Sequence, residues 1–159
     1  MRLIGAGAVF RNAAGQVLLV NPTYKPSWEV PGGIVEEGES PRQCCQRELL
    51  EELGYTGEVG RLLVVDWLPD LGGRGDRVLF LFDGGVVDDD FAESATLPAA
   101  ELSEARFVDL DNAGDYLGPG MVRRIKEAVA HAEAGTTGYL EFGWPDSLPI
   151  VGPEPPESP

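Results

Sequence analysis

The 159-residue chain has few cysteines and no long apolar run. A membrane-spanning helix needs about 20 consecutive, mainly apolar residues, and no such stretch occurs. The N-terminus, Met1 to Gly5, contains no sustained apolar segment of the kind found in secretion signals. The two cysteines, Cys44 and Cys45, are adjacent, which excludes a disulfide framework and is typical of a reducing compartment. We therefore expect a cytoplasmic protein without a membrane partner.

Basic residues are also scarce. The chain has 12 Lys and Arg residues against 27 Asp and Glu residues, which gives a formal net charge of -15. Such a surface repels nucleic-acid backbones and anionic membranes, so we expect no nucleic-acid polymer as a partner. A small phosphate-bearing substrate would be repelled too, unless a carboxylate cluster loaded with a divalent metal ion reversed the local charge.

The length and composition predict one folded domain. Hydrophobic residues make up 43% of the chain, which is close to the average for soluble globular proteins. We expect this domain to cover residues 1–151, with an aromatic extension from residue 136 and a disordered, proline-rich tail over residues 152–159. The aromatic segment, Tyr139 to Trp144, could cover the protein's own core or dock on a second copy, so a homodimer is plausible.

Apolar periodicity and turn residues predict the order of the elements. We expect a hairpin of residues 3–10 and 16–20, a helix from Ser40 to Gly54, strands over residues 56–67, 77–87 and 105–110, and a helix over residues 121–134. This order is typical of an α+β fold, an α/β/α sandwich with a mixed sheet between helices. Within the first helix, Ser40 is the expected N-cap, Pro41 the first helical residue and Gln43 the partner in a capping box, while Gly54 is the expected C-cap.

Three carboxylates lie on one face of the first helix. Glu48, Glu51 and Glu52 are three or four positions apart, so their side chains are neighbours. A solvated face is one explanation, although like charges at this spacing cost roughly 0.2–0.5 kcal/mol per pair. The glycine pair Gly32-Gly33 could bring backbone carbonyls close to an ion, and hard oxygen ligands are those that Mg²⁺ or Mn²⁺ prefer. The pattern therefore indicates a site for one or two divalent ions.

The same residues form a longer pattern, Gly33-x5-Glu39-x7-Arg47-Glu48-Leu49-x-Glu51-Glu52-x-Gly54-Tyr55. This pattern resembles the box of the Nudix hydrolases, and only Tyr55 departs from it, since a bulky aliphatic residue is usual there. The resemblance extends to about residues 2–135 and implies the Nudix fold. It implies that Glu48, Glu51 and Glu52 bind the metal, joined by a carbonyl of Gly32 or Gly33. Arg47 would support catalysis by bracing the loop and helix together with Glu39.

The resemblance further implies a metal-dependent pyrophosphohydrolase that cleaves a nucleoside diphosphate derivative or a nucleoside triphosphate. ADP-ribose, sugar nucleotides, dinucleotide polyphosphates and oxidised dGTP are all candidate substrates. The alternative is a nucleotide-sensing Nudix-fold module without catalysis, which usually lacks some of the box carboxylates. The general base often lies outside the box in this family, so Glu101 and then Glu104 are candidates, and Glu52 is a third. Glu101 and Glu104 could equally be solvated loop acids.

Further residues have both a functional and a packing interpretation. Tyr24, Lys25 and Trp28 precede the box and could contact substrate, although packing is the rival explanation for Trp28. The two cysteines are expected to act as small buried hydrophobes. The basic cluster of the last helix, Arg123, Arg124 and Lys126, could bind phosphate but is expected to be a solvated face.

Overall fold

The computed structural model of this chain describes residues 2–145, and its elements follow in the order strands, helix, strands, helix, strands. They are β1 (Leu3–Arg11), β2 (Val17–Pro22), β3 (Gly32–Ile34), α1 (Pro41–Leu53), β4 (Leu62–Leu68), β5 (Arg77–Val86), α2 (Asp90–Glu93), β6 (Leu102–Val108), the 3₁₀ helix η1 (Leu110–Asp115), α3 (Pro119–Ala134), β7 (Gly138–Glu141) and β8 (Trp144–Pro145). The tail expected over residues 152–159 lies outside the described residues.

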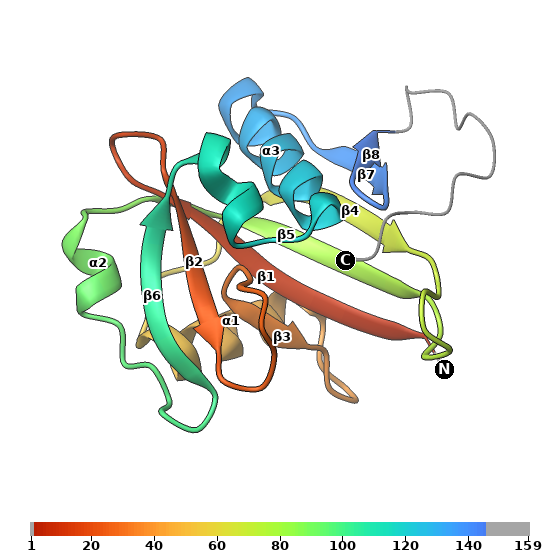
Figure 1. Cartoon of the computed structure of the whole chain (residues 1–159), viewed down its shortest axis with the longest axis horizontal. Helices are drawn as coiled ribbons and strands as arrows, with labels where there is room; N and C mark the ends of the chain where they lie inside the picture. Colours follow the sequence, from red (N-terminus) through yellow and green to blue (C-terminus); the bar gives the residue numbers. More distant parts are fainter. Residues whose placement is uncertain (1, 146–159) are drawn as a thin grey trace.

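One mixed sheet lies between the two longer helices (Figure 1). Its strand order is β6-β2-β1-β5-β4-β7-β8. Strand β3 pairs with β1 at Gly5 to Gly7, whereas β2 pairs with β1 near Arg11. The pairs β1–β5 and β4–β7 are parallel, and the other pairs are antiparallel. Helix α1 packs on one face and α3 on the other, so the expected α+β sandwich is confirmed. Among residues 2–145 no helix is long and apolar enough to cross a membrane.

Alternation along the strands gives the described residues, 2–145, two apolar cores, one on each face of the sheet. In β1, Val9 faces the core beneath α3 and contacts the cluster that contains Ile125, whereas Phe10 faces the core beneath α1 that contains Leu49. These four side chains, Val9, Phe10, Leu49 and Ile125, are each at most 1% exposed. Burying each stabilises the fold by roughly 1.5–3 kcal/mol, which holds both helices against the sheet.

Helix α1 begins and ends where the local sequence predicts. The Ser40 side chain accepts a hydrogen bond from the Gln43 backbone N–H, and the Gln43 side chain accepts one from the Ser40 N–H, so the capping box is complete. Pro41 is the first helical residue, and Gly54 adopts a left-handed conformation (φ 70°) that ends the helix. The carboxylate positions are therefore fixed by local signals on both sides.

The expected start of β4 at residue 56 is wrong, because side chains of α1 bind the backbone of the preceding segment. Gln46 donates to the Gly57 carbonyl (2.6 Å) and accepts from the Val59 N–H (3.1 Å). Arg42 donates to the Val59 carbonyl at 2.7 Å. These bonds replace a strand partner, and the strand starts only at Leu62. The last expected strand, residues 105–110, is also shifted: β6 covers Leu102–Val108, and the chain then turns into η1.

The aromatic extension completes the sheet. Strand β7 pairs with β4, and both Leu140 and Phe142 are buried. Beneath them, the buried Asp66 carboxylate accepts hydrogen bonds from Arg124 Nε (2.5 Å) and from the Gly143 N–H (3.0 Å). The expectation of a solvated basic face is therefore wrong for Arg124, which is 2% exposed, because this ion pair compensates its charge.

Candidate active site

Two glycines allow the carboxylate helix to lie very close to the sheet. A Cβ atom on Gly33 would lie 2.2 Å from Glu48 Oε1, and one on Gly32 would lie 2.3 Å from the Ala6 carbonyl oxygen. Neither position can therefore hold a side chain without displacing its neighbours. The Gly32 N–H donates to Glu52 Oε2 at 3.3 Å, so the glycine backbone and two of the three box carboxylates meet at one point.

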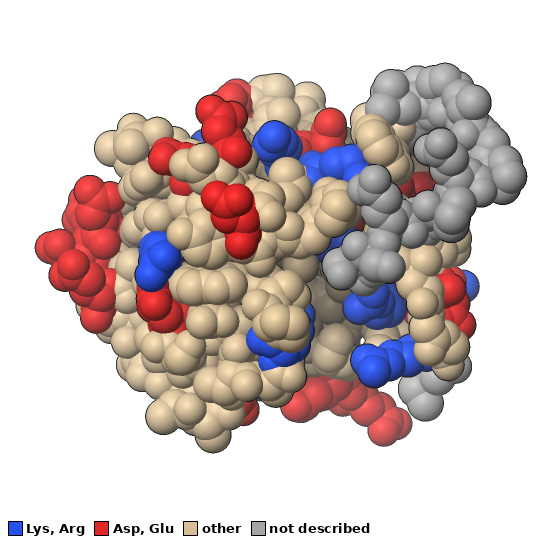
Figure 2. Space-filling view, in the orientation of Figure 1, with Lys and Arg blue, Asp and Glu red and all other residues tan. Residues whose placement is uncertain are grey.

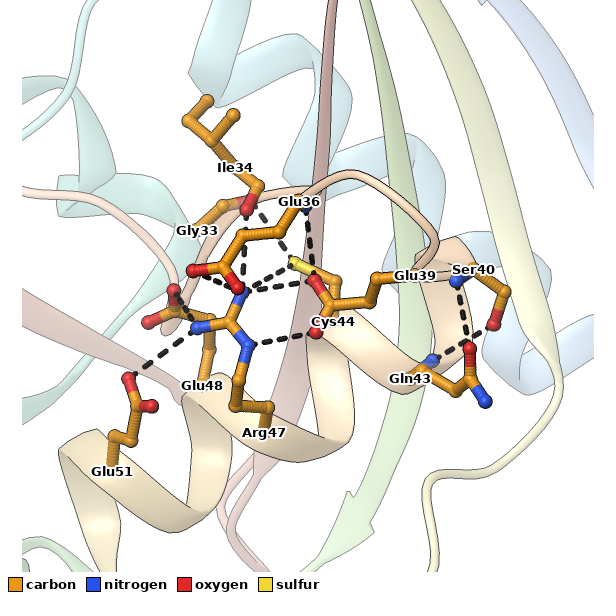
Figure 3. A network of polar contacts seen from close by, with 10 residues as sticks. All are labelled: Gly33, Ile34, Glu36, Glu39, Ser40, Gln43, Cys44, Arg47, Glu48 and Glu51. Carbon is orange, nitrogen blue, oxygen red and sulfur yellow. Dashed lines mark hydrogen bonds and ion pairs between the residues drawn. The ribbon is translucent and has the colours of Figure 1, made fainter.

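Arg47 connects the helix to the loop before it (Figure 3). Its guanidinium donates two hydrogen bonds to Glu39, from Nε at 2.7 Å and from Nη2 at 2.9 Å. Its third nitrogen, Nη1, donates to Glu48 at 2.8 Å and to Glu51 at 3.4 Å. With a longer ion pair to Glu36 (3.8 Å), one side chain thus contacts two loop carboxylates and two helix carboxylates, which agrees with the bracing role that the family resemblance implies.

The Arg47 contact also keeps Glu39 ionised. Hydrogen bonding from Arg47 is the largest cause that lowers the pKa of Glu39 to about 2. A backbone hydrogen bond from the Glu36 N–H to Glu39 Oε1 (3.1 Å) acts in the same direction. The reciprocal contacts raise the pKa of Arg47. The brace therefore stays charged over the whole physiological range of pH.

Glu52 has the opposite environment. Its side chain is buried, at 4% exposure, and burial raises its pKa to about 9, with the negative charge of Glu48 as the next cause. Burial also raises the pKa of Glu48. The main hydrogen-bond donor that compensates Glu52 is the Gly32 N–H, and this hydrogen bond is long for its kind. Glu52 is therefore an under-compensated carboxylate with a second carboxylate beside it, which is the situation that a bound cation relieves.

The donor chemistry fits a divalent ion, although the side chains are held by Arg47. Within residues 2–145, no group of three or more His, Cys, Asp or Glu side chains is spaced to hold a metal ion as the side chains stand. Glu48 and Glu51 point toward Arg47 Nη1, so a cation would compete with this guanidinium for the same oxygens. Carboxylates, and the glycine carbonyls beside them, are the hard ligands that Mg²⁺ and Mn²⁺ use.

The structure brings one of the two outer candidates to this cluster. The charge of Glu101 contributes to the raised pKa of Glu48, and the Glu101 carbonyl accepts a hydrogen bond from the Thr23 N–H at 2.9 Å. Glu104 instead lies within β6 and forms an ion pair with Arg106 at 2.5 Å. Glu101 is thus placed where its charge acts on a box carboxylate, whereas the carboxylate of Glu104 is bound by Arg106.

The loop before the box adds a carboxylate that the sequence interpretation missed. Glu29 contributes to the raised pKa of Glu52. It accepts a hydrogen bond from the Tyr24 hydroxyl (3.2 Å) and forms an ion pair with Lys25 (2.6 Å). Burial first, and then Glu29, raise the pKa of Tyr24 to about 12. Tyr24 and Lys25 are thus joined to the carboxylate cluster through Glu29. The only sequence signal of Glu29 is its place two positions before Pro31.

Trp28 and the cysteines pack against the cores. The Trp28 ring meets Tyr116 edge to face (5.2 Å between centroids), and the guanidinium of Arg106 lies over the Trp28 ring at 5.3 Å. Cys44 and Cys45 are fully buried, which confirms their packing role, and burial raises the pKa of each thiol to about 12. Cys44 also donates a weak hydrogen bond to the Gly33 carbonyl at 3.7 Å.

Comparison with known proteins identifies relatives of this chain. A family model described as the NUDIX domain matches residues 1–131. A Bacillus subtilis protein with the provisional name 8-oxo-dGTP diphosphatase is 35% identical over 95 residues, which are 58% of this chain and 62% of that protein. The RNA pyrophosphohydrolase of Photobacterium profundum is 42% identical over 57 residues, 36% of this chain and 33% of that protein. The chain thus aligns with less than two thirds of either relative.

Solved structures with the same architecture are also found. The MutT protein from Methanosarcina mazei has a TM-score of 0.67 and 26% identity, covering 83% of this chain and 95% of that one. The C. elegans Ap4A hydrolase has a TM-score of 0.65 and 21% identity, covering 83% of this chain and 98% of that one. At 21% identity, the second likeness concerns the fold alone.

Proposed function

Because this chain belongs to the Nudix family, whose domain model covers residues 1–131, we propose that it is a metal-dependent pyrophosphohydrolase. It cleaves the diphosphate linkage of a nucleoside diphosphate derivative or a nucleoside triphosphate. The observation that carries this proposal is the buried Glu52 beside Glu48 at the Gly32–Gly33 backbone, where the Glu52 carboxylate lacks a compensating charge. A structural acidic helix would not keep an uncompensated carboxylate at 4% exposure.

Each box residue has a part in this proposal. Glu48, Glu51 and Glu52 hold Mg²⁺ or Mn²⁺, with a carbonyl of Gly32 or Gly33 as a further ligand. When bound, the ion neutralises phosphate charge, polarises a phosphoryl oxygen and lowers the pKa of a water molecule. In the metal-free protein, Arg47 binds Glu48 and Glu51, and it fixes the loop through Glu39. This bracing keeps the glycine backbone in register with the helix.

A general base completes the reaction by accepting a proton from the attacking water. We propose Glu101, because its charge reaches Glu48 from a loop outside the helix. Its carbonyl is bonded to the Thr23 N–H, so the loop that carries it is tied to the segment before the box. Glu52 is the alternative base. Glu104 is less suited, since Arg106 occupies its carboxylate.

We propose a small nucleotide rather than an RNA end as the substrate. The relatives are named for 8-oxo-dGTP, RNA and Ap4A, so their names share a phosphoric anhydride bond but no single substrate. The net charge of -15 disfavours a long polyanion. Tyr24 and Lys25, both bonded to Glu29, are the proposed substrate contacts, whereas Trp28 packs against Tyr116.

The alternative is a nucleotide sensor that does not turn its ligand over. One experiment distinguishes this sensor from an enzyme. Phosphate release is measured for 8-oxo-dGTP, dGTP, ADP-ribose, a sugar nucleotide and diadenosine tetraphosphate, with Mg²⁺ or Mn²⁺. We expect turnover of at least one compound by the wild type and its loss in Glu52→Gln. The exposed α3 residue Glu133 supplies the matched control, since Glu133→Gln should keep full activity. Tight metal-dependent binding without any turnover would favour the sensor.

A further inference from the structure

Glu101 is the last residue of a segment that contacts the carboxylate helix. This segment, residues 88–101, connects β5 to β6 and includes α2 (Figure 1), and we call it the strap. Its outer side is acidic, since Figure 2 shows Asp and Glu side chains gathered at the end of the molecule where Figure 1 places α2. Its inner side is apolar and packs against the core beneath α1 through Phe91, Ala92, Ala95 and Leu97. The strap is thus attached to the domain along its inner side.

The first attachment is an aromatic cluster at the start of the strap. The centroid of the Phe91 ring lies 4.9 Å from that of Phe10, and 5.9 Å from that of Tyr55, which it meets edge to face. Tyr55 occupies the position of the box pattern where a bulky aliphatic residue is usual. The departure from the pattern therefore gives the strap an aromatic partner just beyond the end of α1, and such pairs stabilise a contact beyond the area that they bury.

The second attachment joins the strap to the residues that carry the box carboxylates. The Leu97 N–H donates to the Glu52 carbonyl at 2.9 Å, and the Thr96 hydroxyl donates to the Glu51 carbonyl at 3.5 Å. Carbonyls in the last turn of a helix have no partner within the helix, so the strap supplies these donors. Leu97 adopts a φ of 42°, in the left-handed region that a leucine disfavours. Such strain persists only where the surrounding contacts impose it, so the strap follows a fixed path at Glu52.

The third attachment is Thr23, which binds the end of the strap with both of its donors. The Thr23 N–H donates to the Glu101 carbonyl at 2.9 Å, and the Thr23 hydroxyl donates to the Ala100 carbonyl at 2.8 Å. The Glu101 N–H in turn donates to the Pro98 carbonyl at 2.9 Å. Both backbone polar groups of Glu101 are therefore bonded, one within the strap and one to the loop that follows β2.

The charge of Glu101 acts on two sides of the candidate site. It contributes to the raised pKa of Glu48 on the helix, and also to the raised pKa of Tyr24, the residue after Thr23. The Glu101 side chain is exposed, so no packing holds it in place. The position of its carboxylate consequently depends on the backbone to which it is attached, and Thr23 binds that backbone directly.

We propose that Thr23 is a positioning residue, which holds the Glu101 carboxylate within reach of the attacking water by binding the carbonyls of Ala100 and Glu101. This inference rests on the proposed function, in which Glu101 is the general base. A general base must lie within hydrogen-bond distance of the proton that it accepts, and a displacement of about 1 Å lowers a rate by about a hundredfold. The Leu97 bond fixes the strap on the Glu52 side, and Thr23 fixes the end that carries the base.

The test removes one hydroxyl and keeps the shape of the side chain. Thr23→Val retains the backbone N–H but loses the hydrogen bond to Ala100, and Thr23→Ser restores it. Thr137→Val is the matched control, because the Thr137 hydroxyl is also exposed and donates to a backbone carbonyl, that of Leu62, at 2.7 Å. Phosphate release is measured with the nucleotide that the wild type hydrolyses fastest. Thr23→Val should lower kcat by about tenfold to a hundredfold with KM near the wild-type value, whereas Thr23→Ser and Thr137→Val should stay near wild type.

A double-mutant cycle shows whether Thr23 acts through Glu101. In the Glu101→Gln background the carboxylate is absent, so Thr23→Val should lower kcat no further. A general loss of stability would lower kcat in both backgrounds. The melting temperatures of Thr23→Val and Thr137→Val should also fall by similar amounts, since each variant loses one exposed hydrogen bond.

The outcomes separate this inference from the proposed function. Equal losses of kcat in both backgrounds, a rise in KM without a loss of kcat, or no effect of Thr23→Val would overturn the role of Thr23. Wild-type kcat in Glu101→Gln would overturn it too, while the hydrolase proposal stands. If the wild type hydrolyses no nucleotide of the panel, the proposed function fails and the inference fails with it.

Discussion

Replacing Glu52 by glutamine should stabilise the metal-free protein at neutral pH, although the residue belongs to the proposed active site. Burial and the charge of Glu48 raise the pKa of Glu52 from 4.5 to about 9. The unfolded chain therefore releases this proton above pH 4.5, whereas the folded protein retains it until about pH 9. Stability is lost as the pH rises through this window, since the folded state binds the extra proton.

The magnitude follows from the width of the window. Each pH unit above 4.5 costs about 1.4 kcal/mol, so at pH 7.5 the wild type loses about 4 kcal/mol, and at pH 5 it loses less than about 1 kcal/mol. Glutamine has no proton to lose and can still accept the hydrogen bond from the Gly32 N–H. Glu52→Gln should remove this pH-dependent cost.

Urea-induced unfolding in EDTA, at pH 5 and at pH 7.5, measures the effect. The gain of Glu52→Gln over the wild type should grow by about 3 kcal/mol between the two values. Glu133→Gln, which changes an exposed residue of α3, should show no such growth. Saturating Mg²⁺ should then stabilise the wild type and narrow its difference from the variant, because the ion binds the folded carboxylates. A gain of equal size at both pH values would refute the reasoning about Glu52.

Three further predictions concern other parts of the molecule. Asp66→Asn should lower the free energy of unfolding by about 3–5 kcal/mol, measured by urea denaturation, because it leaves Arg124 buried without its counter-charge; a loss below 1 kcal/mol would contradict this. Glu101→Gln should reduce kcat by about 10² to 10⁴, whereas Glu104→Gln should stay near wild type in the same phosphate-release assay; equal losses would remove the distinction. Arg47→Ala should lower kcat/KM in the same assay, because the loop loses its anchor through Glu39, while metal-free secondary structure, followed by circular dichroism, stays largely intact; unchanged activity would contradict the bracing role.

Local sequence signals predicted the carboxylate helix almost completely. Ser40 and Gly54 act on backbone groups within a few residues of themselves, so the ends of α1 depend on nothing distant. The same holds for Glu48 and Glu52, whose common face follows from helical periodicity. The two-sided sandwich followed as well, because alternating apolar residues in strands such as β1 must bury both faces.

Contacts between distant segments could not be predicted in this way. Asp66 and Arg124 are separated by 58 residues, and neither has a local feature that marks it as buried. Glu29 and Glu101 reach the carboxylate cluster only because the sheet brings two loops together. The start expected for β4 was too early for the same reason, because Gln46 binds backbone that apolar periodicity had assigned to the strand.

The stretch recognised by similarity and the stretch that folds as a unit are not the same. The family match ends at residue 131, within α3, yet β7 beyond it pairs with the side of β4 that β5 leaves open. A protein cut at that boundary would present β4 as an open strand margin, which is a template for intermolecular pairing and aggregation. It would also leave the Asp66 carboxylate without the Gly143 N–H. Chimeras and truncations that aim at a well-behaved catalytic domain should therefore retain the chain through residue 145.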